Sequence, residues 1–187
     1  MRERITRSAY DLFQEHGYAG TSMQAIAGAA GVTSGAIHHH FPTKEAIGLA
    51  VIEADVSSAF RELWLEPLAA ETSALAVTLK VFRKLAKEFD SQGYVRGCPI
   101  NNLTLELGSM NSIFREPLRM LFDEWRVQLS SALSEERGTL SKNAKNNDAT
   151  ANLVIAAYSG AMSMAKAEQS GGPLRKVADE LEKLLAA

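Results

Sequence analysis

The sequence lacks the features that mark secreted, membrane-spanning or polyanion-coating proteins. Cys98 is the only cysteine in 187 residues, so an intrachain disulfide is excluded and a reducing cytoplasm is the expected location. No window reaches the apolar length that a bilayer span needs, and no signal-type apolar core follows Met1, so no membrane association is expected. The formal net charge of -2 argues against a protein that coats nucleic acid without sequence preference.

Enzyme motifs are missing as well. No phosphate-binding loop, nucleophile elbow or zinc motif is present, and no spacing of serines and histidines assembles a catalytic triad. The consecutive histidines His38, His39 and His40 do not predict a metal site, because successive helical residues point about 100° apart. We therefore expect no enzyme activity, no metal and no cofactor.

Apolar residues recur at helical spacing along nearly the whole chain, and no segment shows the alternation that is typical of a strand. The pattern predicts an all-α protein. Helices are expected over residues 2–16, from 44 to a break at Pro67, over 73–89, from 99 to 108, over 112–136, over 148–169 and from 173 onwards. Pro117 is expected either to bend the 112–136 helix or to mark its true start, and residues 138–147 are expected to form a polar loop.

The stretch from Thr21 to Lys44 predicts two short helices joined by a glycine turn. Thr21 is placed to cap the first helix, and Gly31 permits the left-handed backbone that ends it. Thr33 is placed to cap the second helix, with Ile37 on its buried side. The opposite side of that helix is polar and is formed by Ser34, Gly35, His38 and His39. Such a short helix, apolar inside and polar outside, is typical of the reading helix of a helix-turn-helix.

This predicted reading head has no excess of positive charge. Over residues 1–46 the cationic side chains Arg2, Arg4, Arg7 and Lys44 are balanced by Glu3, Asp11, Glu15 and Glu45. Affinity for DNA would therefore rest on a few well-placed donors. Pairing two heads in a homodimer would compensate for the weak binding of one head.

The helix predicted over 148–169 is apolar on two sides, which is more than a helix with one wet side needs. One stripe carries the larger side chains Val154, Ile155, Tyr158, Met162 and Ala165. The second stripe is made largely of small residues, and together with the last helix it is the expected homodimer interface. That interface would contain Ala157, Gly160, Ala161, Met164, Leu174, Val177 and Leu181. The alternative is that both stripes are buried in the core of one chain.

About the first 47 residues resemble the TetR family of bacterial one-component transcriptional regulators. The matching positions are Ile5, Ala9, Leu12, Phe13, Gly17, Tyr18, Thr21, Ile26, Ala27, Ala30, Gly31, Val32, Gly35, Ile37, His39, Phe41, Lys44 and Glu45. The rest of the chain resembles a subgroup with a Gly97–Cys98 element, Glu106 and a Phe122–Trp125 pair. The resemblance implies an N-terminal three-helix helix-turn-helix DNA-binding domain over 1–46. It implies a C-terminal helical ligand-binding and dimerisation bundle over 47–187.

The resemblance implies a repressor that occupies a pseudo-palindromic DNA operator as a dimer. An unknown small-molecule effector, or thiol modification at Cys98, would release it, with the helix starting at Lys44 as the coupling route. The residues that the resemblance places at DNA are Thr21, Ser22, Thr33, Ser34, Gly35, Ala36, His38, His39 and Lys44. His38 departs from the family pattern, which has tyrosine there, and its imidazole has a shorter reach and a pH-dependent charge.

Cys98 directly precedes Pro99, a residue suited to the first position of a helix. Its thiolate would then be stabilised by the backbone N–H groups of a helix start and by the nearby cation Arg96. The alternative is a small buried thiol that only fills space. The resemblance favours a sensor, since some regulators with a similar element respond to electrophiles or oxidants. In some of them a lysine lies near that thiol, and Lys166 occupies the similar place here.

Candidate effector contacts are polar groups in the helix after Cys98 and the aromatic and methionine side chains of the later helices. They are Asn101, Asn102, Glu106, Phe82, Phe114, Phe122, Trp125, Tyr158 and Met162. The alternatives are core packing for the apolar ones and a solvated surface charge for Glu106. The rival function is a helical adaptor that binds only protein. The polar outer face around Ser34 favours DNA, because a protein-binding helix more often exposes apolar anchors.

Overall fold

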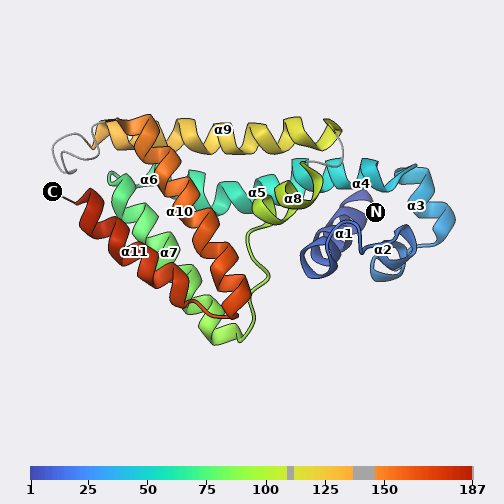
Figure 1. The fold of residues 1–187 in the computed structure, drawn as a ribbon. Coiled ribbons are helices and arrows are strands. Elements are labelled where there is room, and N and C mark those ends of the chain that lie inside the picture. Colours follow the sequence, from blue (N-terminus) through green and yellow to red (C-terminus); the bar gives the residue numbers. More distant parts are fainter. Residues whose placement is uncertain (109–111, 137–145, 187) are drawn as a thin grey trace. The chain divides into compact units, whose positions relative to one another are not determined.

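The computed structural model describes residues 1–108, 112–136 and 146–186, and within these ranges the ordered elements are helices with no strand (Figure 1). The all-α prediction is confirmed. Within the same ranges, no helix combines the length and the apolar character that crossing a bilayer requires.

The chain forms two compact units, and each unit is made of two segments that are separated in the sequence. The first contains Met1–Ala59 and the described part of Pro99–Leu121, and the second contains Phe60–Cys98 and the described residues from Phe122 onwards. The helix after Cys98 thus packs with the N-terminal helices. The boundary at residue 46 that the sequence suggests divides the chain by role, and as such it stays a prediction.

The first unit begins with α1 (Arg2–His16), whose buried side carries Ile5, Ala9 and Phe13 and packs on α2 (Met23–Ala29) and on α4 (Lys44–Val51). The α3 helix (Ser34–His40) packs against α2. Gly17 ends α1 with a φ of 75°, a left-handed conformation that favours glycine. The predicted bounds of the first helix are therefore confirmed.

The helical run that starts at Lys44 continues past the predicted break. After α4 it passes through π-helical η1 (Ile52–Val56), α5 (Ser57–Phe60), π-helical η2 (Arg61–Leu65) and α6 (Glu66–Ala70). Pro67 lies in the first turn of α6 and does not end the helical run. The run ends at Glu71, whose backbone is extended, so the prediction of a stop at Pro67 is wrong.

The second unit is built mainly from α7 (Ala74–Gln92), α10 (Asn147–Glu168) and α11 (Gly172–Leu185). Figure 1 shows α11 lying along α7, and α11 also packs on α10. Gly93 ends α7 in a left-handed conformation, so the helix runs to Gln92, three residues beyond the predicted end at 89.

Two further helices connect these elements along the chain, α8 (Pro99–Leu107) and α9 (Ser112–Glu135). Pro117 lies inside α9 and does not mark its start. Asn146 caps α10, accepting a hydrogen bond from the Ala149 N–H at 3.1 Å, so this helix begins one residue before the predicted start at 148. Most of the loop predicted over 138–147 lies outside the described residues.

Candidate DNA-reading head and thiol site

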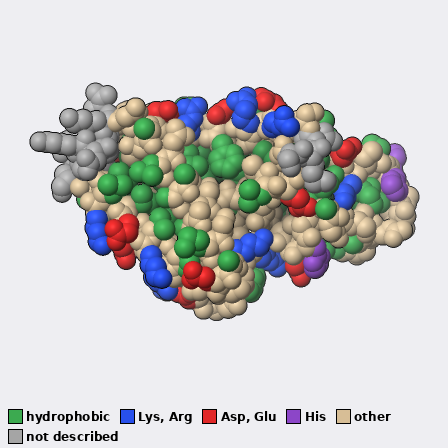
Figure 2. All heavy atoms as spheres, viewed as in Figure 1, with side chains coloured by type: hydrophobic (Ala, Val, Ile, Leu, Met, Phe, Trp, Pro, Cys, Tyr) green, Lys and Arg blue, Asp and Glu red, His purple; other side chains and the backbone are tan. Residues whose placement is uncertain are grey.

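The α3 helix presents the polar face that the sequence predicts. The Thr33 hydroxyl caps it, accepting from the Ala36 N–H at 3.2 Å. Ile37 is only 1% exposed and anchors the inner side. The outer positions are exposed, and they are Ser34, Gly35, His38 and His39. Figure 2 shows histidine side chains at the molecular surface. The reading face is therefore open to a partner.

The turn before α2 differs from the prediction. Ser22, not Thr21, caps α2, with its hydroxyl accepting from the Ala25 N–H at 3.0 Å. Thr21 is 2% exposed, and its hydroxyl donates to the carbonyl oxygen of Gly17 at 2.7 Å. The phosphate contact expected of the Thr21 side chain is wrong for this conformation, because the donor is buried and engaged. Ser22 is exposed, and its phosphate contact stays a prediction.

The ammonium group of Lys44 is directed into the head. It donates to the carbonyl oxygens of Tyr18 and Thr21, both at 3.0 Å, and lies 4.3 Å from the centre of the Tyr18 ring. Burial, together with the carboxylates of Glu45 and Glu106, raises the pKa of Tyr18 to about 12, so the phenol stays neutral at physiological pH. Two of the three N–H donors of Lys44 are thus engaged, and a phosphate contact through the third stays a prediction.

Two residues predicted as effector contacts instead bind the reading head. The Glu106 carboxylate accepts from the backbone N–H groups of Tyr18 and Ala19, at 2.8 and 2.6 Å. The Asn102 side chain donates to the Gln14 side-chain oxygen at 2.9 Å. Glu106 is therefore neither a ligand contact in this conformation nor a solvated charge. Sequence reasoning missed the role of Gln14, because nothing along the chain indicates which helix will lie beside it.

Phe114 also lies in the first unit. Its ring packs edge-on against Tyr18, with centroids 5.4 Å apart. The ring also lies close to Gly48, since a Cβ atom at Gly48 would be 2.9 Å from the nearest Phe114 ring atom. The prediction that Phe114 lines an effector pocket together with Trp125 is therefore not supported, because Phe114 is part of the core of the head.

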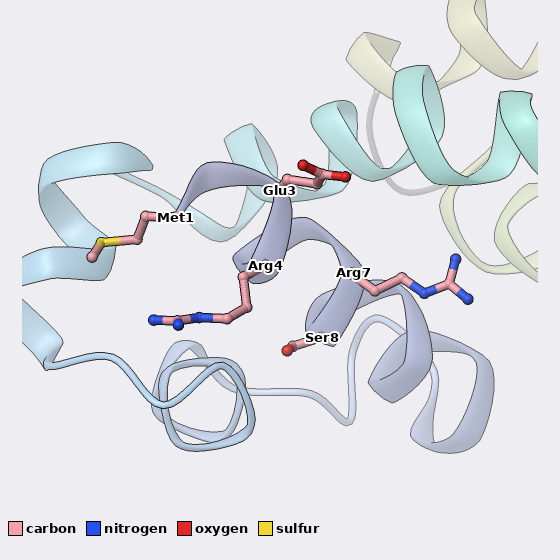
Figure 3. Close-up of a pocket in the computed structure, with 5 residues that line it drawn as sticks. All are labelled: Met1, Glu3, Arg4, Arg7 and Ser8. Atoms are coloured by element: carbon pink, nitrogen blue, oxygen red, sulfur yellow. The ribbon is translucent and has the colours of Figure 1, made fainter.

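The N-terminal helix carries an open hollow of about 510 Å³, lined by Met1, Glu3, Arg4, Arg7 and Ser8 (Figure 3). The side chains of Arg4 and Arg7 point in opposite directions in Figure 3, and Arg7 lies 3.9 Å from the carboxylate of Asp55. Two cations that diverge do not converge on one ligand, so this hollow is not a candidate effector site.

Cys98 lies in the second unit and is 6% exposed. Its thiol is hydrogen-bonded to the Tyr158 hydroxyl, and burial, followed by the nearness of Cys98, raises the pKa of Tyr158 well above its usual range. Arg96, the cation expected to activate the thiol, lies over the ring of Tyr94, with 5.5 Å between guanidinium and ring centre. Lys166 is exposed. The residue that the structure brings to the thiol is therefore Tyr158, which sequence reasoning assigned only to the effector pocket.

Tyr158 belongs to a buried aromatic cluster made of Phe60, Trp64, Phe82, Trp125 and Tyr158. The rings meet mostly edge to face, with Trp125 and Tyr158 centroids 5.3 Å apart. The indole N–H of Trp125 is buried and has no hydrogen-bond acceptor among the described residues. Met162 is 3% exposed and Phe122 is half-buried. The cluster therefore accounts for three of the predicted pocket residues as core: Phe82, Trp125 and Tyr158.

A side chain outside the predicted set holds the segment before Cys98. Gln169 has a φ of 50°, and its amide donates to and accepts from the backbone of Val95, at 3.2 and 3.0 Å. This two-way bond fixes the loop between α7 and α8 to the end of α10. The sequence signals the helix end at this position, through the following Ser170, Gly171 and Gly172, but it gives no sign of the partner.

The predicted dimer residues divide into two groups. Ala161, Leu174 and Leu181 are at most 4% exposed and pack inside the second unit, so their assignment to a dimer surface is wrong. The exposed or half-buried group is Ala157, Gly160, Met164 and Val177. Leu153 and Met164 are 45% and 53% exposed, and hydrophobic side chains gather over α10 in Figure 2. An apolar surface on α10 is thus present, and it contains Ala157, Gly160 and Met164 of the predicted stripe, whereas Ala161 is buried.

The packed head and the exposed α3 face define a helix-turn-helix DNA-binding protein with a helical second unit. A sequence profile described as bacterial regulatory proteins, tetR family, matches residues 5–51. A profile described as the C-terminal domain of LmrA/YxaF-like transcriptional regulators matches residues 74–180. The chain therefore belongs to the TetR family and is a transcriptional regulator.

Individual relatives agree with this assignment over nearly the whole chain. The transcriptional repressor DhaR of Mycobacterium sp. (strain GP1) is 27% identical over 176 residues, or 93% of this chain and 86% of DhaR. The crystal structure of regulatory protein TetR from Rhodobacter sphaeroides has a TM-score of 0.87 at 26% identity, covering 98% of both chains. The reduced form of Escherichia coli NemR has a TM-score of 0.88 at 23% identity, covering 99% of this chain and 96% of NemR, which supports the fold.

Proposed function

We propose that this regulator is a repressor that binds a pseudo-palindromic operator as a homodimer. The observation that carries the proposal is the exposed polar face of α3, capped by Thr33 and anchored by Ile37. The relative DhaR is named a repressor, which favours repression over activation. We propose that the protein binds this operator in the cytoplasm.

Dimerisation supplies the second reading head. Because the head has balanced charges, one head binds weakly, and two heads with fixed spacing bind a two-fold symmetric site much more tightly. The exposed apolar residues of α10, Leu153, Gly160 and Met164, support an interface on this helix. Val177 of α11 is half-buried and lies at the expected edge of that interface.

Release is assigned to the second unit. A small-molecule effector, or modification of the Cys98 thiol, would favour a dimer whose heads are wrongly spaced for the two half-sites. The Tyr158 hydroxyl beside the thiol supports a role for this site, since a group added to sulfur removes the S–H donor and must be accommodated next to this hydroxyl. The similarity to NemR, solved in a form described as reduced, is consistent with thiol chemistry.

A selection of duplexes from a random DNA pool, with and without N-ethylmaleimide, tests these steps together. We expect the wild-type protein to enrich a site with two-fold symmetry and to lose it after thiol alkylation. The Cys98→Ser variant keeps a hydrogen-bonding group beside Tyr158, so it should bind the same duplex and resist release. Release of Cys98→Ser by the reagent would contradict the sensor role, since the chain has no other cysteine. Failure to enrich any duplex would favour the protein-binding adaptor.

A further inference from the structure

The turn between α1 and α2, residues 17–21, is held by two oppositely charged side chains. The Glu106 carboxylate of α8 accepts from the N–H groups of Tyr18 and Ala19, at 2.8 and 2.6 Å. The Lys44 ammonium of α4 donates to the carbonyl oxygens of Tyr18 and Thr21, both at 3.0 Å. The anionic side chain thus binds backbone N–H groups of the turn, and the cationic side chain binds backbone carbonyl oxygens of the same turn. We call these two side chains the turn clamp.

The turn is shaped to receive the carboxylate. A Cβ atom at Gly17 would stand 3.1 Å from one Glu106 oxygen and 3.4 Å from the other, and the φ of Gly17 is 75°. Glycine at position 17 therefore has two roles: it adopts the positive φ without strain, and its missing side chain leaves room for the Glu106 carboxylate. Both carboxylate oxygens are used, which makes the hydrogen bonds charge-assisted and the geometry specific.

The α8 helix is attached to the head at two successive turns. Asn102 bonds Gln14 near the end of α1, and Glu106, four residues later on the same side of α8, bonds the turn that follows. The helix begins at Pro99, directly after the Cys98 thiol. A short rigid element thus carries the anchoring residues of the head, and its start adjoins the proposed sensor.

We propose that Glu106 is a positioning residue for DNA recognition, holding the turn clamp in the geometry that α2 and α3 need to read the operator. This inference rests on the proposed function and assigns a new role within it. Ser22, directly after the turn, caps α2, so a change in the turn moves the start of the helix that supports α3. Loss of the clamp would leave the head folded but would reduce the fraction in the reading geometry.

Glu106→Gln tests this role, because the amide keeps the size but replaces one acceptor with a donor that faces an N–H group. We expect affinity for the selected duplex to fall roughly tenfold, the scale of a charge-assisted hydrogen bond. Amide exchange at Tyr18 and Ala19 should accelerate. The substitution also removes a negative charge, which by itself would strengthen DNA binding. Weaker binding would therefore be the opposite of a purely electrostatic effect.

Glu116→Gln is the matched control, because Glu116 lies in the first unit, is exposed and pairs with Arg119. It removes the same charge and should leave affinity unchanged or slightly higher. Glu106→Asp keeps the charge and withdraws the carboxylate by one methylene, so it should also weaken binding. The Glu106→Asp variant therefore still tests the proposal if Glu106→Gln does not fold. Fluorescence of Trp64 and Trp125 reports whether the second unit remains intact in each variant.

Unchanged operator affinity in a folded Glu106→Gln or Glu106→Asp variant would overturn the proposal, whether or not amide exchange accelerates. If the wild-type protein enriches no duplex, the proposed function itself has failed, and the positioning role falls with it. If the wild-type protein enriches a duplex and only the positioning role is wrong, wild type and both Glu106 variants will bind alike.

Discussion

In the first unit the turn over residues 17–21 is held by polar contacts to its backbone, whereas in the second unit the aromatic cluster is held by packed rings. Around residues 17–21, Glu106, Lys44 and Thr21 bond backbone groups directly. In the second unit, Trp125 and Tyr158 are packed edge to face with other aromatic side chains, and both are at most 2% exposed. The stabilising contacts thus differ in kind between the two regions.

This difference bears on how a regulator can switch. A hydrogen bond exchanges with water at a net cost of about 1 kcal/mol, so a turn held by a few of them has accessible alternatives. A close-packed aromatic core loses several kcal/mol when one ring is removed. We therefore expect adjustment at the turn and resistance to change in the aromatic cluster, unless a ligand or a modified thiol changes the cluster itself.

The largest effect should come from Trp125→Ala, which opens the aromatic cluster. Trp125 is 0% exposed, and we expect a loss of about 3 to 5 kcal/mol in unfolding free energy. The value should fall near the lower end, because the buried indole N–H, which lacks an acceptor within the described part of the chain, is removed with the ring. Denaturant unfolding followed by Trp64 fluorescence measures it.

Val127→Ala, on the same helix, is the control for the aromatic cluster. Val127 is 54% exposed, and the change should stay within about 0.5 kcal/mol. Equal losses for Trp125→Ala and Val127→Ala would contradict the picture of a rigid ring core.

A smaller effect is expected in the head from Gly48→Ala. A Cβ at Gly48 would lie 2.9 Å from a Phe114 ring atom and 3.0 Å from the Tyr18 ring, so α4 must shift. Overpacking of this kind costs about 1 to 3 kcal/mol. Circular dichroism should show an earlier transition while tryptophan fluorescence holds its midpoint, because both tryptophans belong to the second unit.

Gly28→Ala in α2 is the matched substitution. Apart from the backbone of its own helix and its chain neighbours, no atom of the residues that the structure describes lies within 4 Å of the added Cβ, so helix propensity alone should stabilise the head by up to about 1 kcal/mol. A destabilised Gly28→Ala would contradict this interpretation, because the loss of stability in Gly48→Ala could then not be attributed to the contact of its Cβ with Phe114 and Tyr18.

The smallest effect should be a pH dependence from Asp55 in η1. Burial raises the pKa of this carboxyl, and Asp11 adds to the rise against the lowering effects of Thr6 and Arg7. The folded state therefore holds the proton more tightly than the unfolded state. The resulting stability is present below the unfolded pKa and is lost as pH rises through the folded one.

Asp55→Asn should accordingly gain stability relative to wild type as pH rises from 4 to 7, measured by thermal unfolding at each pH. The exposed neighbour Glu53→Gln should show no such trend. A gain for Asp55→Asn that is independent of pH would indicate packing rather than proton linkage.

Much of the fold follows from local patterns in the sequence. Apolar spacing predicted the helices now seen as α1, α7, α8 and α10, because a helix buries one face wherever it lies. Thr33 and Thr43 cap as a local side-chain rule requires. The same rule led to a wrong prediction at Thr21, because Thr21 is buried beneath α1 and Ser22 caps α2 instead.

The reading head was the part of the site most accessible to sequence reasoning. Its outer positions lie on one exposed face because helix periodicity sets that arrangement, and they are Ser34, Gly35, His38 and His39. The effector residues were less accessible. Glu106 and Phe114 lie in the first unit and Tyr158 lies in the second, and no spacing along the chain distinguishes them.

The sequence by itself determined an all-α protein with a helix-turn-helix head, since periodicity, caps and glycine stops act within a few residues. Tertiary structure alone decided that Glu106 and Lys44 clamp one turn and that Tyr158 meets the Cys98 thiol. It also decided which face of α10 stays exposed. The physical reason is that a charged or polar group is satisfied by whichever partner packing brings near, and for the turn clamp these partners lie 23 to 88 residues away along the chain.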